Sequence, residues 1–124
     1  MKKIAFISKR KVLIQSLCDA IKSNSRLNFE TYSLYNIEQS LVDVEVLGVD
    51  VIVIDVSEDK KNDSLSLCDK LRTVLPDCKL LLLISLDDKE AKDFAVSAVK
   101  DGSADDFVFY DTSLEYLFAK LAAF

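Results

Sequence analysis

The chain has 124 residues, of which 50% are hydrophobic, and this is enough for one compact domain with a single core but not for two domains. Its 21 acidic and 16 basic residues give a net charge of −5, which disfavours nonspecific binding to nucleic acid or to anionic membrane surfaces. No apolar stretch is long enough to span a bilayer, so we expect a single cytoplasmic domain over residues 1–124.

Histidine is absent from the chain, which removes the usual imidazole general base and every histidine-based metal site. The three cysteines, Cys18, Cys68 and Cys78, lie in apolar segments without paired CxxC spacing. We therefore expect reduced thiols in the core and no metal site built from cysteine.

The first half of the chain is predicted to form two strand–helix pairs followed by a third strand. Apolar runs favour strands, and apolar residues three and four positions apart favour helices. In chain order these segments are Lys3–Ile7, Val12–Ile21, Leu27–Tyr32, Ile37–Leu47 and Val51–Asp55. Gly48 is placed to end the second helix.

The second half continues the alternation after the polar loop 57–63. In chain order the predicted segments are Ser64–Leu75, Lys79–Ser85, Asp88–Val99, Phe107–Tyr110 and a last helix through Ala123. Pro76 follows the first of these helices and Gly102 follows the second, while Thr112 or Ser113 can cap the last one.

Four consecutive β-branched residues, Val51 to Ile54, cannot alternate between core and solvent. They indicate a central parallel strand that is covered on both faces. Five such strand–helix units predict an α/β fold in which a parallel sheet is sandwiched by helices, about two on one face and three on the other.

Side chains that follow parallel strands meet at one edge of the sheet, where α/β proteins place their ligands. The candidates at this edge are Ser8, Lys9, Asp55, Ser85, and Phe109 or Tyr110. On position alone, Asp55 can also simply cap the next turn or helix.

Three features together resemble the receiver domain of two-component response regulators. Asp55 ends the strand VIVID, Ser85 ends LLLLIS, and the phrase Ala104-Asp105-Asp106-Phe107-Val108 precedes the last helix. The resemblance covers essentially the whole chain. It implies a flavodoxin-like, three-layer (βα)5 sandwich with strand order 2-1-3-4-5 and a signalling role rather than an enzymatic one.

The resemblance also implies roles for residues at the edge of the sheet. Asp55 would accept a phosphoryl group from a kinase phosphohistidine, and Ser85 would donate a hydrogen bond to that group. In receivers an acidic pair after the first strand holds Mg²⁺, and a lysine after the fifth strand pairs with the phosphoryl oxygens.

The chain departs from this pattern twice. Ser8-Lys9 stands where the acidic pair is expected, and Phe109 or Tyr110 stands where the lysine is expected. We therefore expect weak or absent Mg²⁺ binding, no other cofactor, and phosphorylation of Asp55 that is impaired or lost.

Lys9 offers a replacement for the missing metal, because its ammonium can pair with Asp55 and keep that carboxylate from being desolvated alone. The alternative is that Lys9 simply extends into solvent. A displaced cation site formed by Asp55, Glu58 and Asp87 is a further alternative, although solvated loop charges explain the latter two acids as well.

Two rival functions remain open. One is an ordinary phosphorylatable receiver that tolerates the changed pocket. The other is a small flavodoxin-like enzyme or a nucleotide- or flavin-binding protein, but the chain has only two glycines and no glycine-rich phosphate loop after any strand.

The receiver resemblance implies protein partners, namely a histidine kinase and an output domain. It also implies a homodimer formed through the last two helices and the fifth strand. Membrane binding and direct nucleic-acid binding by this domain are not expected.

Overall fold

The computed structural model describes residues 1–56 and 61–124, with side chains from residue 64 onward in the second range. In this part of the chain five strands alternate with five helices. The strands are β1 (Lys2–Ile7), β2 (Phe29–Leu34), β3 (Val51–Asp55), β4 (Lys79–Ile84) and β5 (Asp106–Phe109). The helices are α1 (Lys11–Lys22), α2 (Ile37–Leu47), α3 (Lys61–Val74), α4 (Lys89–Asp101) and α5 (Leu114–Ala123).

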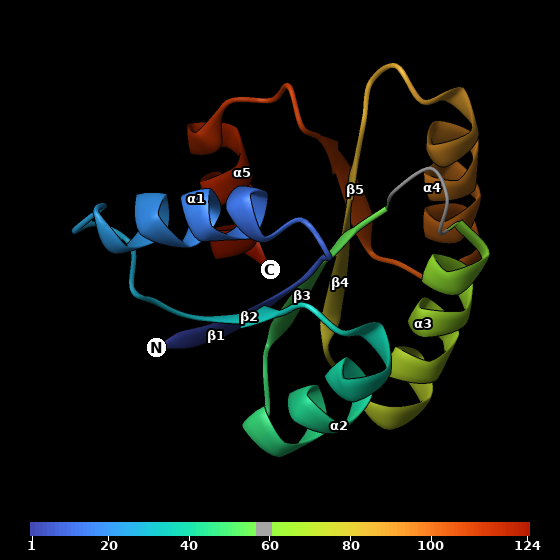
Figure 1. The fold of residues 1–124 in the computed structure, drawn as a ribbon, viewed down its shortest axis with the longest axis horizontal. Coiled ribbons are helices and arrows are strands. Elements are labelled where there is room, and N and C mark those ends of the chain that lie inside the picture. Colours follow the sequence, from blue (N-terminus) through green and yellow to red (C-terminus); the bar gives the residue numbers. More distant parts are fainter. Residues whose placement is uncertain (57–60) are drawn as a thin grey trace.

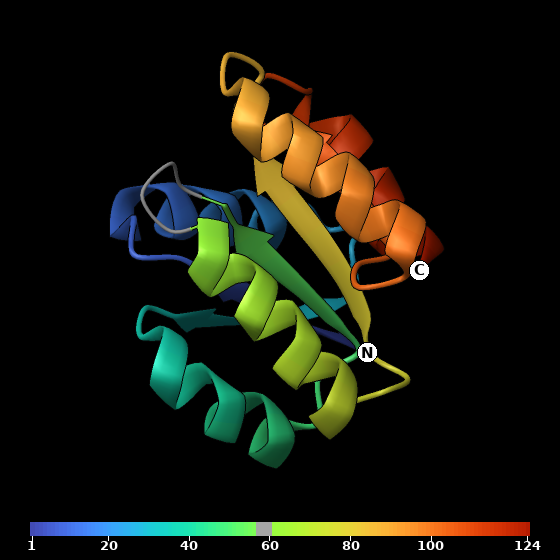
Figure 2. The ribbon, with the colours of Figure 1, turned by 90° about the vertical axis from the view of Figure 1, so that its right-hand side faces the viewer.

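The strands form one parallel sheet in the order β2-β1-β3-β4-β5. Helices α1 and α5 cover one face of the sheet, and α2, α3 and α4 cover the other (Figures 1 and 2). The predicted flavodoxin-like sandwich, its strand order and the division of helices between two faces are therefore confirmed.

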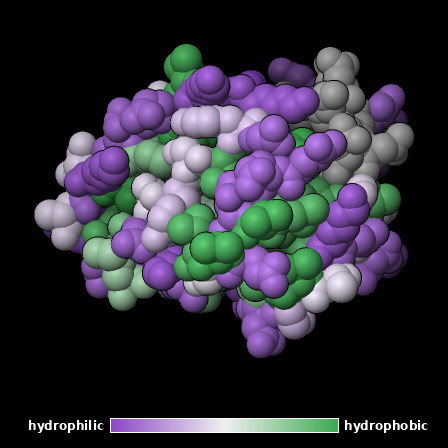
Figure 3. All heavy atoms as spheres, turned by 60° about the horizontal axis from the view of Figure 1, so that its bottom comes forward, coloured by the Kyte–Doolittle hydropathy of each residue, from purple (hydrophilic) through white to green (hydrophobic). Residues whose placement is uncertain are grey.

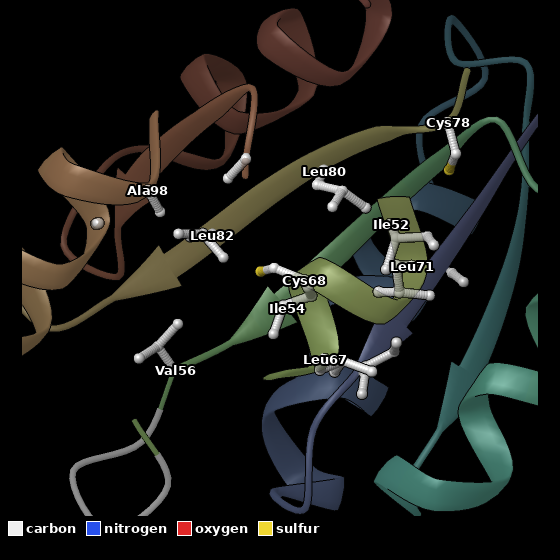
Figure 4. Close-up of a cluster of buried hydrophobic side chains, with 14 of the residues drawn as sticks. Ile52, Ile54, Val56, Leu67, Cys68, Leu71, Cys78, Leu80, Leu82 and Ala98 are labelled. Carbon is white, nitrogen blue, oxygen red and sulfur yellow. The ribbon is translucent and has the colours of Figure 1, made fainter. Parts of the chain in front are cut away.

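The apolar run of β3 is buried on both faces of the sheet, as its composition predicts. Val51 and Val53 join the core cluster under α1 and α5, whereas Ile52 and Ile54 join the cluster under α2, α3 and α4. Figure 4 shows the second cluster, in which side chains of α3 lie over β3 and β4. Two cores thus hold β3 rigidly, so the residue at its carboxyl end has a fixed position.

The three cysteines are free and buried in these cores, as expected. The pKa of Cys68 is raised to about 11, mainly because the thiol is buried. Burial likewise raises the pKa of Cys78 to about 12. Both thiols therefore stay protonated and unreactive near neutral pH.

Among the described residues, side chains cap α2, α4 and α5 at their amino ends. The side-chain oxygens of Asn36, Asp88 and Ser113 each accept a backbone N–H of the first turn that follows. Ser113, rather than Thr112, is thus the cap of α5. Gly48 and Gly102 end α2 and α4 with φ of 64° and 82°, a left-handed conformation that glycine adopts without strain.

Several boundaries differ from the sequence prediction. Strand β2 begins and ends two residues later than predicted, and β5 ends at Phe109 rather than at Tyr110. Helix α3 begins at Lys61, three residues before the predicted start. The sequence does not reveal this start, because the first residues of the helix are polar and carry no apolar periodicity. Strands β1 and β3 nevertheless end at Ile7 and Asp55, as predicted.

The surface around α2 is mixed in character. Val42 and Val46, one turn apart on α2, are 55% and 80% exposed. Figure 3 brings this side of the molecule forward and shows hydrophobic residues gathered in a band among hydrophilic ones. Among the helices that the structure describes, none combines the length and the apolar character needed to cross a membrane.

Candidate functional site

The candidate site lies where β1, β3 and β5 end. In the parallel pairing of β1 with β3, Ile7 lies opposite Ile54, so the next residues, Ser8 and Asp55, project at the same edge of the sheet. Tyr110 follows β5, and its N–H donates a 2.9 Å hydrogen bond to the carbonyl of Ile84 at the end of β4.

Both carboxylate oxygens of Asp55 are held by Arg10. The Nε of Arg10 donates to Oδ2 at 2.8 Å and its Nη2 donates to Oδ1 at 2.8 Å. This two-pronged geometry is the strong form of an arginine–carboxylate pair. The Asp55 side chain is only 3% exposed, whereas that of Arg10 is 51% exposed, so the guanidinium covers the carboxylate from the solvent side.

Ser8 makes a third contact with the same carboxylate. Its hydroxyl donates a 2.5 Å hydrogen bond to Oδ2 of Asp55 and accepts a 2.9 Å hydrogen bond from the backbone N–H of Arg10. The buried Ser8 therefore turns the chain after β1 so that the side chain of Arg10 comes back over the end of β3.

Tyr110 supports the guanidinium from the β5 side. The central carbon of the Arg10 guanidinium lies 4.4 Å from the centroid of the Tyr110 ring, which is within the range of a cation–π contact. Among the described residues, the buried hydroxyl of Tyr110 has no hydrogen-bond partner. The ring face, and not the hydroxyl, is thus what Tyr110 contributes to the site.

Of the two alternatives for Lys9, the ion pair with Asp55 is wrong because Arg10 makes it, and the structure agrees with the other, in which Lys9 extends into solvent. Lys9 is exposed and lines two hollows beside the site, and Asp55 pairs with Arg10. Because Ser8 is buried, the next residue points outward and the one after it returns to the sheet. Sequence reasoning missed Arg10, although the run Ser8-Lys9-Arg10-Lys11 did signal a cation at this position.

The other predicted residues make contacts of their own. The hydroxyl of Ser85 accepts a 3.3 Å hydrogen bond from the N–H of Asp87 and is half-buried just after β4. Asp87 is exposed, and Glu58 lies outside the described residues. Phe109 ends β5 and packs edge-on against Phe107, with ring centroids 5.7 Å apart.

The described residues at this edge supply few ligands for a divalent cation. In the part of the chain that the structure covers, no group of three or more histidine, cysteine or acidic residues is placed to hold a metal ion. Mg²⁺ requires octahedral oxygen ligands. The carboxylate of Asp55 already accepts hydrogen bonds on both oxygens, and Ser8 and Lys9 bring no negative charge.

No protein-family model matches the chain, and no curated protein matches it. Solved structures do match. A two-component response regulator from Clostridium difficile is 22% identical, with a TM-score of 0.78 over 99% of this chain and 94% of that one. A response regulator from Thermotoga maritima is 19% identical, with a TM-score of 0.80 over 99% of this chain and 96% of that one.

A response regulator from Burkholderia pseudomallei, whose structure contains a phosphorylated aspartic acid and a calcium ion, is also similar. It is 25% identical, with a TM-score of 0.76 over 96% of this chain and 65% of that one. The resemblance to response regulator receiver domains is thus confirmed over nearly the whole chain, and the fold of this protein is a receiver fold.

Proposed function

We propose that this protein is a receiver-like signalling domain that acts through protein–protein contacts and whose Asp55 is held by Arg10. Mg²⁺-dependent phosphorylation of Asp55 is then impaired or lost. The similar structures of response regulators support the signalling role. The main observation that supports the proposed loss of phosphorylation is the two-pronged contact between Arg10 and Asp55.

The reason is chemical. A phosphoacceptor carboxylate needs one oxygen free to attack phosphorus, and the transferred group needs cations that neutralise its oxygens. Here Oδ1 and Oδ2 of Asp55 both accept hydrogen bonds from the same guanidinium. Arg10 must leave before either oxygen can react, and Ser8 and Lys9 provide no carboxylate that would bring Mg²⁺ in its place.

The same proposal includes a protein partner. The structures that match this chain include an adenylate cyclase from Rhodopirellula baltica and the receiver domain of an HD domain-containing protein from Pseudomonas fluorescens. We expect this domain likewise to contact a kinase, an output domain or a second copy. The apolar side chains of Val96, Leu114 and Tyr116 are exposed on α4 and α5 and suit such a contact.

Acetyl phosphate tests the proposal. The protein is incubated with acetyl phosphate and Mg²⁺, and its intact mass is compared with that of D55N. We expect no phosphoryl adduct on the wild type, and an adduct on the variant Ser8→Asp, Lys9→Asp, Arg10→Ala, which restores the acids and removes the competing cation. Stoichiometric modification of the wild type that disappears in D55N would contradict the proposal.

One observation favours the rival function, an ordinary phosphorylatable receiver. The Arg10 side chain is half exposed, so it can rotate into solvent without leaving a buried charge of its own. If this rotation is easy, the wild type accepts the phosphoryl group. The same mass measurement therefore separates the two functions.

A further inference from the structure

A hollow of about 560 Å³ opens beside the carboxyl edge of the sheet, between α2 and α3. These two helices lie next to each other on the same face of the sheet (Figures 1 and 2). The volume is within the range of sites that bind small organic molecules. The three hydrogen bonds to Asp55 described above come from Arg10 and Ser8, and neither residue lines this hollow.

Two lysines from different elements reach the hollow. Lys9 lines it from the loop after β1, and Lys70 lines it from α3. Within the described residues, neither lysine takes part in an ion pair. In a chain of net charge −5, two unpaired ammonium groups that share one hollow favour an anionic ligand. Glu38 is the one carboxylate among the described lining residues, so the lining carries an excess of positive charge.

The remaining lining is suited to an organic body rather than to a bare ion. Ile37, Leu41 and Leu67 line the hollow and belong to the apolar packing under α2 and α3. Tyr35 contributes an aromatic ring from just before the start of α2, and Ser66 contributes a hydroxyl from α3. Apolar walls with a few convergent polar groups are typical of small-molecule sites.

This hollow adjoins the Asp55 site. A smaller hollow of about 70 Å³ shares Lys9, Ile37 and Leu67 with it and is also lined by Arg10 and Asp55. A ligand held by Lys9 would therefore lie next to the guanidinium that covers Asp55. This gives Lys9, which takes no part in holding Asp55, a function of its own.

We propose that the hollow between α2 and α3 binds a small organic anion, with its carboxylate or phosphate between Lys9 and Lys70 and its apolar part against Ile37, Leu41 and Leu67. The inference stands whether or not Asp55 accepts a phosphoryl group, because no lining residue of the larger hollow is needed for that reaction. It assigns the ligand by chemistry alone: one terminal oxyanion on an apolar body.

The fluorescent probe 8-anilinonaphthalene-1-sulfonate has this chemistry and tests the proposal. We expect saturable binding at one site on the folded wild type, and a dissociation constant weaker by about tenfold or more in the variant Lys9→Ala, Lys70→Ala. The variant Lys79→Ala, Lys100→Ala removes the same charge from exposed lysines outside the hollow and should bind as the wild type does. Ser66→Phe, which fills the hollow without removing charge, should also abolish binding.

Competition distinguishes the two kinds of oxyanion. Displacement of the probe by phenyl phosphate supports a phosphate ligand, and displacement by phenylacetate supports a carboxylate ligand. Inorganic phosphate that competes as well as phenyl phosphate would overturn the proposal, because the apolar walls would then contribute nothing. Absence of saturable binding, or equal binding by both lysine double variants, would overturn it as well. Thermal unfolding of each variant confirms that it is folded.

Discussion

Arg10 and Asp55 differ in how far they are removed from water, and this difference sets the energetics of their contact. The Arg10 side chain is 51% exposed and can be solvated on its own, whereas the Asp55 side chain is 3% exposed. A buried carboxylate without a partner costs far more than a half-exposed guanidinium without one. The contact therefore stabilises the fold mainly because it gives the buried carboxylate of Asp55 a partner.

Removing the guanidinium should destabilise the fold. For R10A we expect a loss of about 1–3 kcal/mol in the free energy of unfolding, because Asp55 then keeps, among the described residues, the hydroxyl of Ser8 alone. R10K keeps the charge without the fork and should fall between R10A and the wild type. Urea unfolding measures these values.

The control for this prediction is the second substitution D55N. Because it removes the buried charge, D55N should restore part of the stability that R10A loses, and the double-mutant cycle should give a favourable coupling of about 1 kcal/mol or more. Additive losses from R10A and D55N would mean that the contact contributes nothing to stability.

Tyr110 should act through its ring. Y110F keeps the face that lies over Arg10 and removes a buried hydroxyl that has no partner among the described residues. We expect Y110F to unfold at the same urea concentration as the wild type or a higher one, while Y110L loses about 1 kcal/mol. A large loss of stability in Y110F would show that the hydroxyl is hydrogen-bonded after all.

The identity of the residue that pairs with Asp55 could be predicted only in part from the sequence. The sequence indicates that a cation replaces the acidic pair, because Ser8-Lys9-Arg10 follows the first strand. It does not indicate which cation turns inward, since that depends on the hydrogen bond between Ser8 and the N–H of Arg10. The path of the loop after β1 therefore determines that Arg10, and not Lys9, pairs with Asp55.

At the scale of the elements, two glycines end helices in a conformation that other residues adopt at a cost. Gly48 has φ of 64°, and a Cβ at this position would contact nothing within 4 Å, so backbone strain alone opposes substitution. We expect G48A to lose about 1 kcal/mol of stability and G48N to lose less, because asparagine tolerates this conformation better. Urea unfolding of the two variants provides the comparison.

The use of both glycines as helix ends also bears on function. Neither Gly48 nor Gly102 lies in a loop that follows a strand, where a phosphate-binding loop of a nucleotide enzyme would be. This observation counts against the flavodoxin-like enzyme or nucleotide-binding alternative in the described part of the chain.

The buried thiols give a prediction about pH. The folded state raises the pKa of Cys68 to about 11. It raises the pKa of Cys78 to about 12. In unfolded protein both thiols ionise near their ordinary value of 9.0, so their effect on stability is absent below that pH and stability falls as the pH rises toward the folded values.

Urea unfolding at pH 8 and at pH 10 measures this fall in stability. A thiol reagent at pH 8 tests the burial of the two thiols separately. We expect Cys68 and Cys78 to react at the rate of global unfolding and to react at once in denaturant. Labelling of either cysteine in the folded protein at the rate of a free thiol would show that α3 or the start of β4 opens locally.

Element boundaries were predicted less well than element types, and the reason is physical. Apolar periodicity reports which residues face the core, so β3 and α2 were predicted to the residue. The first three residues of α3 are polar in the sequence, so no apolar pattern marks where the helix begins, and its predicted start is three residues late.

At the scale of the whole molecule, the continuous apolar strands and the strand–helix alternation are sufficient to predict the layers. The unbroken run Val51 to Ile54 requires cover on both faces, and the structure provides it with two helices on one side and three on the other (Figure 1). The strand order came from the resemblance to receivers, because periodicity alone does not distinguish the possible orders of five parallel strands.

The guanidinium of Arg10 holds both oxygens of Asp55, and we propose that it takes the place of a metal ion. The Nε–H of Arg10 reports this directly in a ¹H–¹⁵N NMR spectrum, with the exposed Arg26 as the internal reference. We expect an Arg10 signal that exchanges slowly with water and does not change when millimolar Mg²⁺ and beryllofluoride are added. An Arg10 signal as fast-exchanging as that of Arg26, or one that disappears as the two reagents bind, would contradict the account.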